Sequence, residues 1–201
     1  MPAVYLDCNA TTPLDPEVQE VFWHYLTEEF GNEGSRTHEF GARAKQAVQK
    51  ARDQVAAVAG AKRDDVIFTS GATESNNLGL LGLREAGLEK GRRHVVTTAI
   101  EHKAVLEPCA ALETAGFEVT RLPVGESGCV DPEAVRSALR PDTWLVSVMQ
   151  INNETGVRQP LGAISEILAD HPAYFHTDAA QGVGKDLAGL RHPRIDLISV
   201  S

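Results

Sequence analysis

In Phe175-His176-Thr177-Asp178-Ala179-Ala180-Gln181, a short strand pattern runs directly into a carboxylate. Ala173 and Tyr174, just before it, belong to the same expected strand. A carboxylate at the carboxyl end of a parallel strand faces the crevice in which α/β folds bind ligands. The alternative is that Asp178 caps the first turn of a helix that follows the strand. Which interpretation holds depends on whether the sheet is parallel.

Expected strands and helices alternate along the chain from about residue 66 onward. Strands are expected at residues 66–69, 94–99, 117–122, 143–149, 174–177 and 195–200. Helices are expected at residues 71–86, 103–115, 131–139 and 161–169. This alternation predicts an α/β fold of three layers with a mostly parallel central sheet.

The first 60 residues carry a different pattern. Residues 4–7 are expected to form a short strand or an extended arm, and Asp15-Pro16 has the N-cap and first-turn signature of a helix that continues to about Glu29. An apolar stripe of helical period starts at Phe40, and Gly60 ends that second helix. We expect an N-terminal arm at 1–15, a helical segment at 16–60 and the large domain at 61–201.

The composition is that of an ordinary globular protein. Its 201 residues are 42% hydrophobic and 23% charged, which allows one large domain with a small appendage. The formal net charge of −9 argues against direct nucleic-acid binding, because phosphate recognition needs a basic face. No apolar run approaches the roughly 20 residues that a membrane span requires.

The cysteines indicate a reducing compartment. Cys8, Cys109 and Cys129 are widely spaced and contain no CxxC pair, so neither a zinc site nor a disulfide framework is expected. The N-terminus lacks the basic and apolar regions of a signal peptide. We therefore expect a cytoplasmic protein without a metal site in these residues, and Cys109, on an expected amphipathic helix, is interpreted as a core residue.

Ser70-Gly71-Ala72-Thr73 lies between an expected strand and an expected helix. A helix N-terminus offers free N–H groups and a partial positive charge, so this turn is a candidate phosphate site. The alternative is an ordinary helix cap. Asn76-Asn77 weakens that alternative, because two consecutive asparagines are poor choices inside a helix.

Three further candidates follow other expected strands. His102 follows the strand at 94–99, and its imidazole could stack on an aromatic cofactor or shuttle protons; the alternative is a surface or capping residue. Asn152-Asn153-Glu154-Thr155-Gly156 follows the strand at 143–149 and could be a simple turn. Gln181 could donate to a phenolate oxygen, or could be a surface helix residue.

The collected motifs resemble the cysteine desulfurases of the NifS/IscS type, which are fold-type I pyridoxal-phosphate enzymes in the class V aminotransferase group. The resemblance covers all 201 residues and corresponds to the first half of a family member. It is carried by Tyr5-Leu6-Asp7-Cys8-Asn9-Ala10-Thr11-Thr12-Pro13, Gly31-Asn32, Phe68-Thr69-Ser70-Gly71-Ala72-Thr73-Glu74-Ser75-Asn76-Asn77, Glu101-His102, Asn152-Asn153-Glu154-Thr155-Gly156 and His176-Thr177-Asp178-Ala179-Ala180-Gln181.

The resemblance implies that the cofactor is pyridoxal 5′-phosphate and assigns its contacts. Ala72 and Thr73 would bind the cofactor phosphate, with Ser201 as a further ligand. His102 would stack on the pyridine ring and is the candidate for proton transfer. Asp178 would pair with the ring nitrogen and keep it protonated, which makes the ring an electron sink.

Further contacts are implied around the ring and the substrate. Asn153 and Gln181 would contact ring substituents, Gln181 at the phenolic oxygen, and Asn9 would approach the substrate side. The family often has Asp-Asn-Ala-Ala-Thr-Thr where this chain has Asp7-Cys8-Asn9-Ala10-Thr11-Thr12, so Cys8 occupies a variable position. The loop at 31–38 departs from the usual Asn-Pro-Ser-Ser pattern, which leaves a local substrate contact open.

The largest departure is at the end of the sequence. In the family, the strand ending Ser-x-Ser leads into Gly-His-Lys, and that lysine holds the cofactor as a Schiff base. The nucleophilic cysteine and the arginine that binds the substrate carboxylate come later still. We therefore expect these 201 residues to be inactive alone, to expose apolar surface and to belong to a longer or cleaved polypeptide.

The parent enzyme is expected to convert L-cysteine to L-alanine as a cytoplasmic homodimer, with possible metal binding elsewhere in the parent. Its sulfur would pass as a persulfide to an acceptor protein in iron–sulfur assembly, tRNA thiolation or DNA phosphorothioation. Three alternatives stay open: a selenocysteine lyase or related class V aminotransferase, a non-catalytic fragment, and a plain nucleotide-binding α/β domain. The last lacks a GxGxxG or GxxxxGK[ST] phosphate loop.

Overall fold

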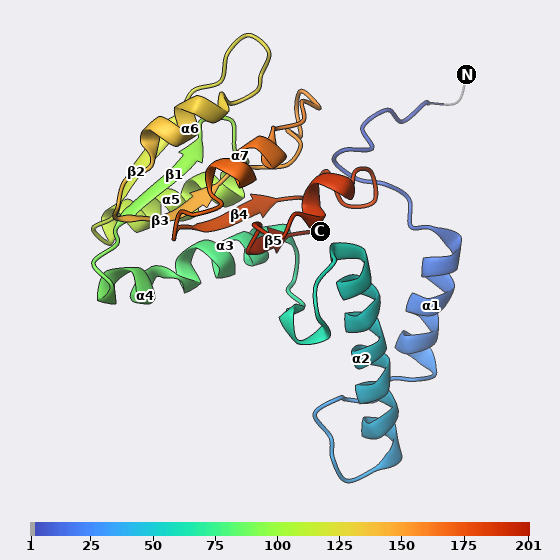
Figure 1. The fold of residues 1–201 in the computed structure, drawn as a ribbon. Helices are drawn as coiled ribbons and strands as arrows, with labels where there is room; N and C mark the ends of the chain where they lie inside the picture. The colour runs from blue at the N-terminus through green and yellow to red at the C-terminus, as the bar shows by residue number, and fades with distance from the viewer. Residues whose placement is uncertain (1–2) are drawn as a thin grey trace. The chain divides into compact units, whose positions relative to one another are not determined.

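A computed structural model describes residues 3–201 (Figure 1). The chain forms two compact units that divide between Ile67 and Phe68, and each unit is described by itself. The expected division at residues 15 and 60 stays a prediction. None of the helices within the described residues is both long and apolar enough to cross a membrane.

The first unit contains α1 (Pro16–Thr27), α2 (Glu39–Ala59) and the short 3₁₀ helix η1 (Arg63–Asp65). The Asp15 carboxylate accepts a hydrogen bond from the backbone N–H of Glu17 at 2.9 Å, which caps the start of α1 as its sequence predicts. Gly60 ends α2 with φ of 74°, a left-handed conformation that glycine adopts without a steric penalty. Both expected helices of this unit are thus present.

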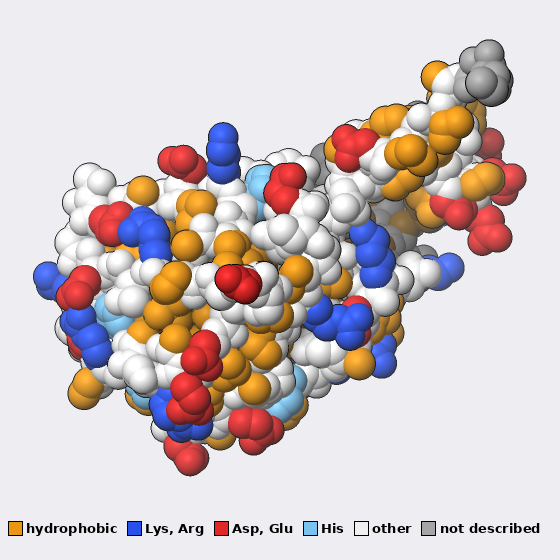
Figure 2. Space-filling model, turned by 90° about the horizontal axis from the view of Figure 1, so that it is seen from above, with side chains coloured by type: hydrophobic (Ala, Val, Ile, Leu, Met, Phe, Trp, Pro, Cys, Tyr) orange, Lys and Arg blue, Asp and Glu red, His pale blue; other side chains and the backbone are white. Residues whose placement is uncertain are grey.

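Helix α1 has no buried residue. Large apolar side chains along it are exposed, as are others before and after it, and orange hydrophobic side chains are visible at the molecular surface in Figure 2. The exposed set of this helix is Val18, Val21, Phe22, Trp23, Tyr25 and Leu26. Exposed apolar surface of this kind agrees with the expectation from the sequence.

The second unit is built on a five-stranded sheet. Its strands are β1 (His94–Thr98), β2 (Glu118–Leu122), β3 (Thr143–Ser147), β4 (Tyr174–Asp178) and β5 (Leu197–Ser199). They lie in the order β2-β1-β3-β4-β5, and every neighbouring pair is parallel. The predicted α/β fold with a mostly parallel sheet is therefore confirmed.

Helices cover both faces of this sheet (Figure 1). They are α3 (Ala72–Gly82), α4 (Arg84–Glu89), α5 (Lys103–Thr114), α6 (Pro132–Ala138), α7 (Leu161–Ile167) and the 3₁₀ helix η2 (Ala188–Arg191). Val95 packs with the α3 and α5 side chains, whereas its neighbour Val96 packs with those of α6 and α7. Successive strand residues point to opposite faces, so a sheet covered on both sides needs the continuous apolar runs seen here.

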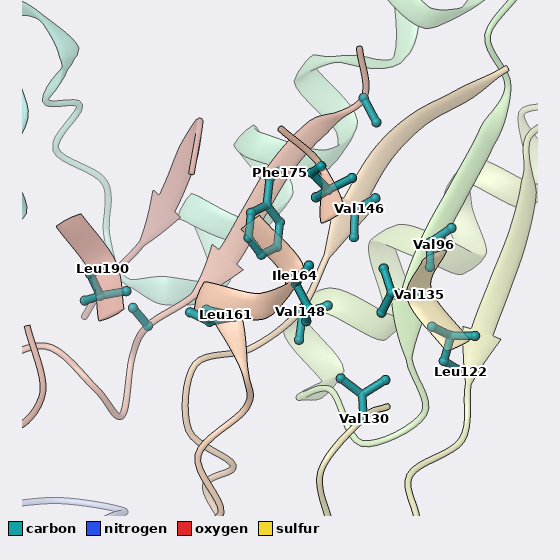
Figure 3. Close-up of a cluster of buried hydrophobic side chains, with 13 residues drawn as sticks. Val96, Leu122, Val130, Val135, Val146, Val148, Leu161, Ile164, Phe175 and Leu190 are labelled. Carbon is teal, nitrogen blue, oxygen red and sulfur yellow. The ribbon is translucent and has the colours of Figure 1, made fainter. Parts of the chain in front are cut away.

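Figure 3 shows the larger of the two cores, on the face covered by α6 and α7. Phe175 of β4 is fully buried there beside Val146 of β3, Ile164 of α7 and Val148. Burying side chains of this size provides about 1.5–3 kcal/mol each. This packing fixes β4 in the sheet and, with it, the position of the carboxylate at its end.

Two sequence expectations were wrong, and a third was decided between its alternatives. Residues 66–69 form no strand of the sheet, and Ile67 and Phe68 are exposed. Residues 4–7 form no strand, which leaves the extended arm that was the other expectation for them. The single helix expected at 71–86 is two helices, which meet at Leu83 and reach Glu89. Hydrophobic periodicity does not show whether an apolar segment joins a sheet. It also does not show where a helical segment is interrupted.

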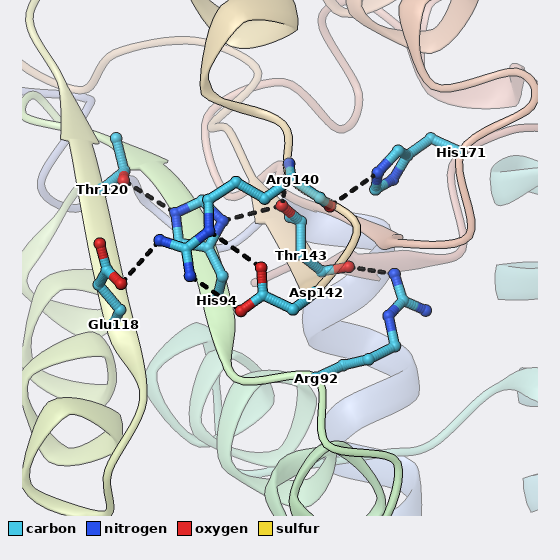
Figure 4. Close-up of polar contacts among 8 residues, drawn as sticks. All are labelled: Arg92, His94, Glu118, Thr120, Arg140, Asp142, Thr143 and His171. Carbon is cyan, nitrogen blue, oxygen red and sulfur yellow. Dashed lines mark hydrogen bonds and ion pairs between the residues drawn. The ribbon is translucent and has the colours of Figure 1, made fainter.

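A polar cluster lies at the amino ends of β1, β2 and β3 (Figure 4). His94 is buried, with Nδ1 2.8 Å from the Thr143 hydroxyl and Nε2 2.8 Å from the Thr120 hydroxyl. Arg140 forms ion pairs with Glu118 at 2.7 Å and with Asp142 at 2.8 Å. Burial lowers the pKa of His94 and favours the neutral ring. Because these groups partner one another, this end of the sheet reads as structural.

Candidate functional site

The sequence-predicted site residues of the second unit lie at the opposite, carboxyl end of the sheet. His102 follows β1, Asn153 follows β3, Asp178 ends β4 and Ser201 follows β5. These four strands are consecutive neighbours in the sheet. Parallel strands place all their carboxyl ends at one edge, which is where α/β folds bind ligands.

The N-terminus of α3 offers unused backbone donors. Its N-cap is Gly71, which has φ of 152° and provides no side-chain cap. The N–H groups of Gly71, Ala72 and Thr73 have no hydrogen-bond partner among the described residues, whereas the Ser70 N–H donates to the Glu74 carboxylate at 2.5 Å. Three free N–H groups at the positive end of an 11-residue helix suit a phosphate group.

Asp178 is buried, with only 5% of its surface exposed. Its Oδ2 accepts a 2.8 Å hydrogen bond from the side-chain amide of Asn76, and its Oδ1 accepts a 3.0 Å bond from the Ala180 N–H. No helix begins directly after Asp178, where residues 180–185 form turns, so the alternative interpretation as a helix cap is wrong. An ionised carboxylate has about four acceptor positions, so two donors leave room for a ligand N–H.

A chain of hydrogen bonds runs beneath this carboxylate from β3 to α3. The Ser147 hydroxyl lies 2.8 Å from Nδ1 of His176, and Nε2 of that ring lies 3.0 Å from the Ser199 hydroxyl. The Ser75 hydroxyl donates to Ser199 at 3.0 Å. Complete burial lowers the pKa of His176 to about 4, so the ring is neutral near pH 7.

His102 is the exposed N-cap of α5, and its Nδ1 accepts a 3.1 Å hydrogen bond from the Ala104 N–H. The capping role that the sequence left open is therefore present. A neutral imidazole that accepts at Nδ1 carries its proton on Nε2. Any role of this ring toward a ligand is thus through Nε2–H or the ring face.

Glu101 joins the loops that follow β1 and β3. Its Oε1 accepts hydrogen bonds from the Thr98 hydroxyl at 2.7 Å and the Met149 N–H at 2.9 Å. Its Oε2 is buried and has no partner within the described residues. Burial, together with the charge of Asp178, raises the pKa of Glu101 to about 8, so it is mostly protonated at pH 7.

The loop after β3 forms the turn that the sequence left as an alternative. Asn152 accepts hydrogen bonds from the N–H groups of Glu154 at 3.0 Å and Thr155 at 2.9 Å, and its own amide donates to the Ile100 carbonyl at 3.0 Å. Asn153 is half-buried, and its amide donates to Glu154 at 2.7 Å. The loops after β1 and β3 are therefore held together.

The remaining candidates are less constrained. Gln181 lies in a turn rather than a helix, and its Oε1 accepts from the Lys185 ammonium at 3.2 Å. Ser201 is exposed, and Asn9 is an exposed residue of the first unit. Cys109 is a core residue as expected, and burial raises its thiol pKa to about 12.

These groups fit a phosphorylated, nitrogen-containing aromatic cofactor. The free N–H groups of Gly71, Ala72 and Thr73 suit a phosphate, and the buried Asp178 suits a cationic ring nitrogen. The same helix supplies both the phosphate donors and the Asn76 amide that contacts Asp178. Pyridoxal 5′-phosphate has both features on one pyridine ring.

The sequence did not assign Ser75, Asn76, His176, Ser199 and Glu101 a place in this site. One signal for Asn76 was present, because consecutive asparagines inside a helix are unfavourable unless their amides have partners. The buried hydrogen bond to Asp178 provides that partner for Asn76. Nothing in the sequence pattern marked the contacts of Ser199 or His176, which join segments far apart in the chain.

Known proteins resemble this chain over nearly its whole length. A family model described as Aminotransferase class-V matches residues 4–201. A cysteine desulfurase of Mus musculus is 48% identical over 198 residues, which are 98% of this chain and 43% of the mouse protein. The chain therefore spans less than half the length of that relative.

Two solved structures are also similar. The crystal structure of DndA from Streptomyces lividans is 52% identical, with a TM-score of 0.88, and the match covers 98% of this chain and 55% of that one. A structure described as SspA in complex with cysteine is 38% identical, with a TM-score of 0.90, and the match covers 98% of this chain and 56% of the other.

Proposed function

The chain belongs to the class-V aminotransferase family, and we propose on that premise that it forms the cofactor-binding part of a cysteine desulfurase. This enzyme would convert L-cysteine to L-alanine and pass the sulfur, as a persulfide, to an acceptor. The resemblance assigns the cofactor lysine and the nucleophilic cysteine to sequence that follows these 201 residues. Activity is therefore proposed for the complete polypeptide.

One observation carries the proposal: a buried carboxylate, Asp178, is hydrogen-bonded to the helix whose N-terminus has free N–H groups. Pyridoxal 5′-phosphate, when bound, supplies an electron sink that lowers the barrier to bond cleavage at a substrate amino acid. Asp178 favours a protonated ring nitrogen, because a nearby negative charge stabilises the cation. The N–H groups of Ala72 and Thr73 bind the phosphate, with Ser201 as an additional ligand.

His102 is proposed to stack on the ring and to present Nε2–H to the substrate side. Because the Ala104 N–H donates to Nδ1, the neutral ring has its own N–H at Nε2. Asn153 and Gln181 are proposed to contact ring substituents, Gln181 at the phenolic oxygen. Asn9 is proposed to approach the substrate.

L-cysteine is the proposed substrate, supported by the cysteine desulfurase relatives and by the cysteine complex of SspA. The sulfur acceptor is proposed to be a protein, since a net charge of −9 disfavours direct delivery to nucleic acid. A homodimer in the cytoplasm is the proposed state. The pathway served, whether iron–sulfur assembly, tRNA thiolation or DNA phosphorothioation, depends on that acceptor.

The test measures cofactor binding and L-cysteine turnover on the same protein preparation. Binding of pyridoxamine 5′-phosphate is measured first, because this ligand needs no lysine, and L-alanine release from L-cysteine is measured after reconstitution with pyridoxal 5′-phosphate. We expect both. Failure to bind pyridoxamine 5′-phosphate contradicts the proposal, and binding without turnover by the complete polypeptide supports a non-catalytic role instead.

Asp178→Ala separates the ring contact from phosphate anchoring. We expect this variant to lose cysteine desulfuration almost completely, by 100-fold or more as an order-of-magnitude estimate, because an unprotonated ring is a poor electron sink. Phosphate anchoring at α3 is expected to survive, measured as weakened but detectable binding of pyridoxamine 5′-phosphate. Near-normal alanine release would contradict the role given to Asp178.

A further inference from the structure

Helix α3 is joined to the sheet by polar contacts as well as by apolar packing. Asn76 is completely buried and donates to Asp178 at 2.8 Å, while the neighbouring Ser75 donates to Ser199 at 3.0 Å. One turn later, a Cβ at Gly79 would lie 3.6 Å from Cδ2 of His176, an ordinary contact distance. The helix therefore approaches β4 and β5 closely over this stretch.

The orientation of the Asn76 amide follows from its partner. An ionised carboxylate only accepts hydrogen bonds, so the NH₂ group of Asn76 must face Asp178 and its Oδ1 must point away. That Oδ1 is buried and has no partner among the described residues. Leaving a buried carbonyl oxygen unsatisfied destabilises the folded state. The contact of the Asn76 amide with Asp178 is therefore made at the expense of the Oδ1 atom of the same side chain.

The contact restrains Asp178 on one of its two oxygens. Oδ1 is held by the Ala180 N–H, which is local, whereas Oδ2 is held by Asn76 from another element. Without the amide, the carboxylate could rotate about its side-chain bonds and lose the second donor. The hydrogen bonds from Ser75 to Ser199 and between Ser199 and His176 fix the position of α3 relative to β4 and β5. The Asn76 amide therefore reaches Asp178 from a fixed helix.

We propose that Asn76 is a positioning residue for Asp178, which fixes the carboxylate that pairs with the cofactor ring nitrogen at a set distance from the phosphate-binding turn of the same helix. The proposal rests on the proposed function, since it needs a ring nitrogen opposite Asp178. Asn76 touches no cofactor atom in this scheme. Its effect is exerted entirely through the carboxylate.

The test compares two ligands that differ at one atom. Pyridoxamine 5′-phosphate has the ring nitrogen, and its 1-deaza analogue has a C–H group in that place and cannot pair with Asp178. Both ligands carry the same phosphate, so its contribution to affinity cancels in the ratio of their dissociation constants. The ratio therefore measures the contribution of the ring nitrogen alone. A hydrogen bond to a charged group implies a preference of the unmodified protein for the nitrogen ligand of roughly tenfold or more.

Asn76→Ala is expected to reduce this preference to within about threefold, while binding of the 1-deaza analogue changes little. Ser75→Ala on the same helix is the matched variant. It removes a hydrogen bond to β5 without touching Asp178, so it is expected to weaken both ligands alike and preserve the ratio. Fluorescence titration measures the six dissociation constants, two for each of the three proteins, and urea unfolding confirms that each variant is folded.

An unchanged ratio in Asn76→Ala overturns the positioning role, as does an equal loss of affinity for both ligands. If Asn76→Ala fails to fold, Asn76→Leu, which fills the volume without donating, is measured in the same way. If the unmodified protein binds neither ligand, the proposed function itself is wrong. The two failures are therefore distinguishable.

Discussion

Glu101 is the residue whose ionisation is most altered by its surroundings at the site. Its carboxyl group is 5% exposed, and burial raises its pKa to about 8 from an ordinary value of 4.5. The folded state thus binds the proton more tightly than the unfolded chain. Stability from this group is full below pH 4.5 and is lost as the pH rises toward 8.

The unfolding free energy is therefore expected to fall by roughly 1 kcal/mol per pH unit between pH 6.5 and 8 through Glu101. Glu101→Gln should remove this slope, because an amide does not ionise yet still accepts from Thr98 and Met149. Urea unfolding at several pH values measures it. The exposed Glu107→Gln is the control and should keep the slope of the unmodified protein; a slope that persists in Glu101→Gln would contradict the assignment.

Local sequence signals predicted correctly where several candidate residues lie in the fold. Asp178 ends a strand and Gly71 to Thr73 begin a helix, as their patterns indicated, while their roles toward a cofactor stay proposals. Asn76, Ser199 and His176 were not assigned because their partners lie up to 124 positions away along the chain. Such contacts depend on the tertiary fold rather than on any local pattern.

At the scale of elements, caps and hydrophobic periodicity predicted most boundaries. Helix α2 has a complete apolar stripe and a C-cap glycine, and it runs from Glu39 to Ala59 as expected. The strand expected at residues 66–69 is absent because strand propensity alone does not add a segment to the sheet, and this one is extended without being a strand. The helix from 71 was expected to be continuous because no proline or charge pattern marks the break at Leu83.

Helix α6 offers a direct test of a cap. The Asp131 carboxylate accepts from the Glu133 N–H at 2.9 Å, and Pro132 occupies the first turn. Asp131→Ala is expected to lower the unfolding free energy by about 1 kcal/mol, since it leaves that donor without its partner. Urea unfolding measures the change. Glu126→Ala, in the exposed loop before the helix, should be neutral, and equal effects would argue against capping as the cause.

At the scale of the whole molecule, three buried or half-buried histidines make the fold sensitive to acid. Burial lowers the pKa values of His94, His171 and His176, the last to about 4. Their folded pKa values lie below that of the unfolded chain, about 6.5. The stability they contribute is full above that value and is lost as the pH falls through it toward 4.

Glu101 changes stability in the opposite direction over the same pH range, so the test uses the Glu101→Gln variant, in which urea midpoints are expected to decrease steadily from pH 7 to pH 5, with His176 alone contributing roughly 1 kcal/mol per pH unit. His176→Gln keeps a polar side chain at the position and cannot be protonated. This variant should be less stable at pH 7, because glutamine does not reproduce both hydrogen bonds of the ring. Its unfolding free energy should decrease less than that of the parent protein when the pH is lowered. A midpoint that is constant between pH 7 and 5 in Glu101→Gln would show that these rings do not titrate on unfolding.

The strand order β2-β1-β3-β4-β5 sets the sequence in which the molecule can be made. Once β1 and β2 have paired, β3 adds beside β1, and β4 and β5 each add beside the strand that precedes them, so every strand after β1 meets a partner that has already been synthesised. The bonds from Ser75 to Ser199 and from Asn76 to Asp178 close the longest loops of all. Long-range closure is slow, so the carboxyl edge around Asp178 is expected to be the final part of this unit to form, and the proposed cofactor site is incomplete in a nascent chain until β5 has joined the sheet.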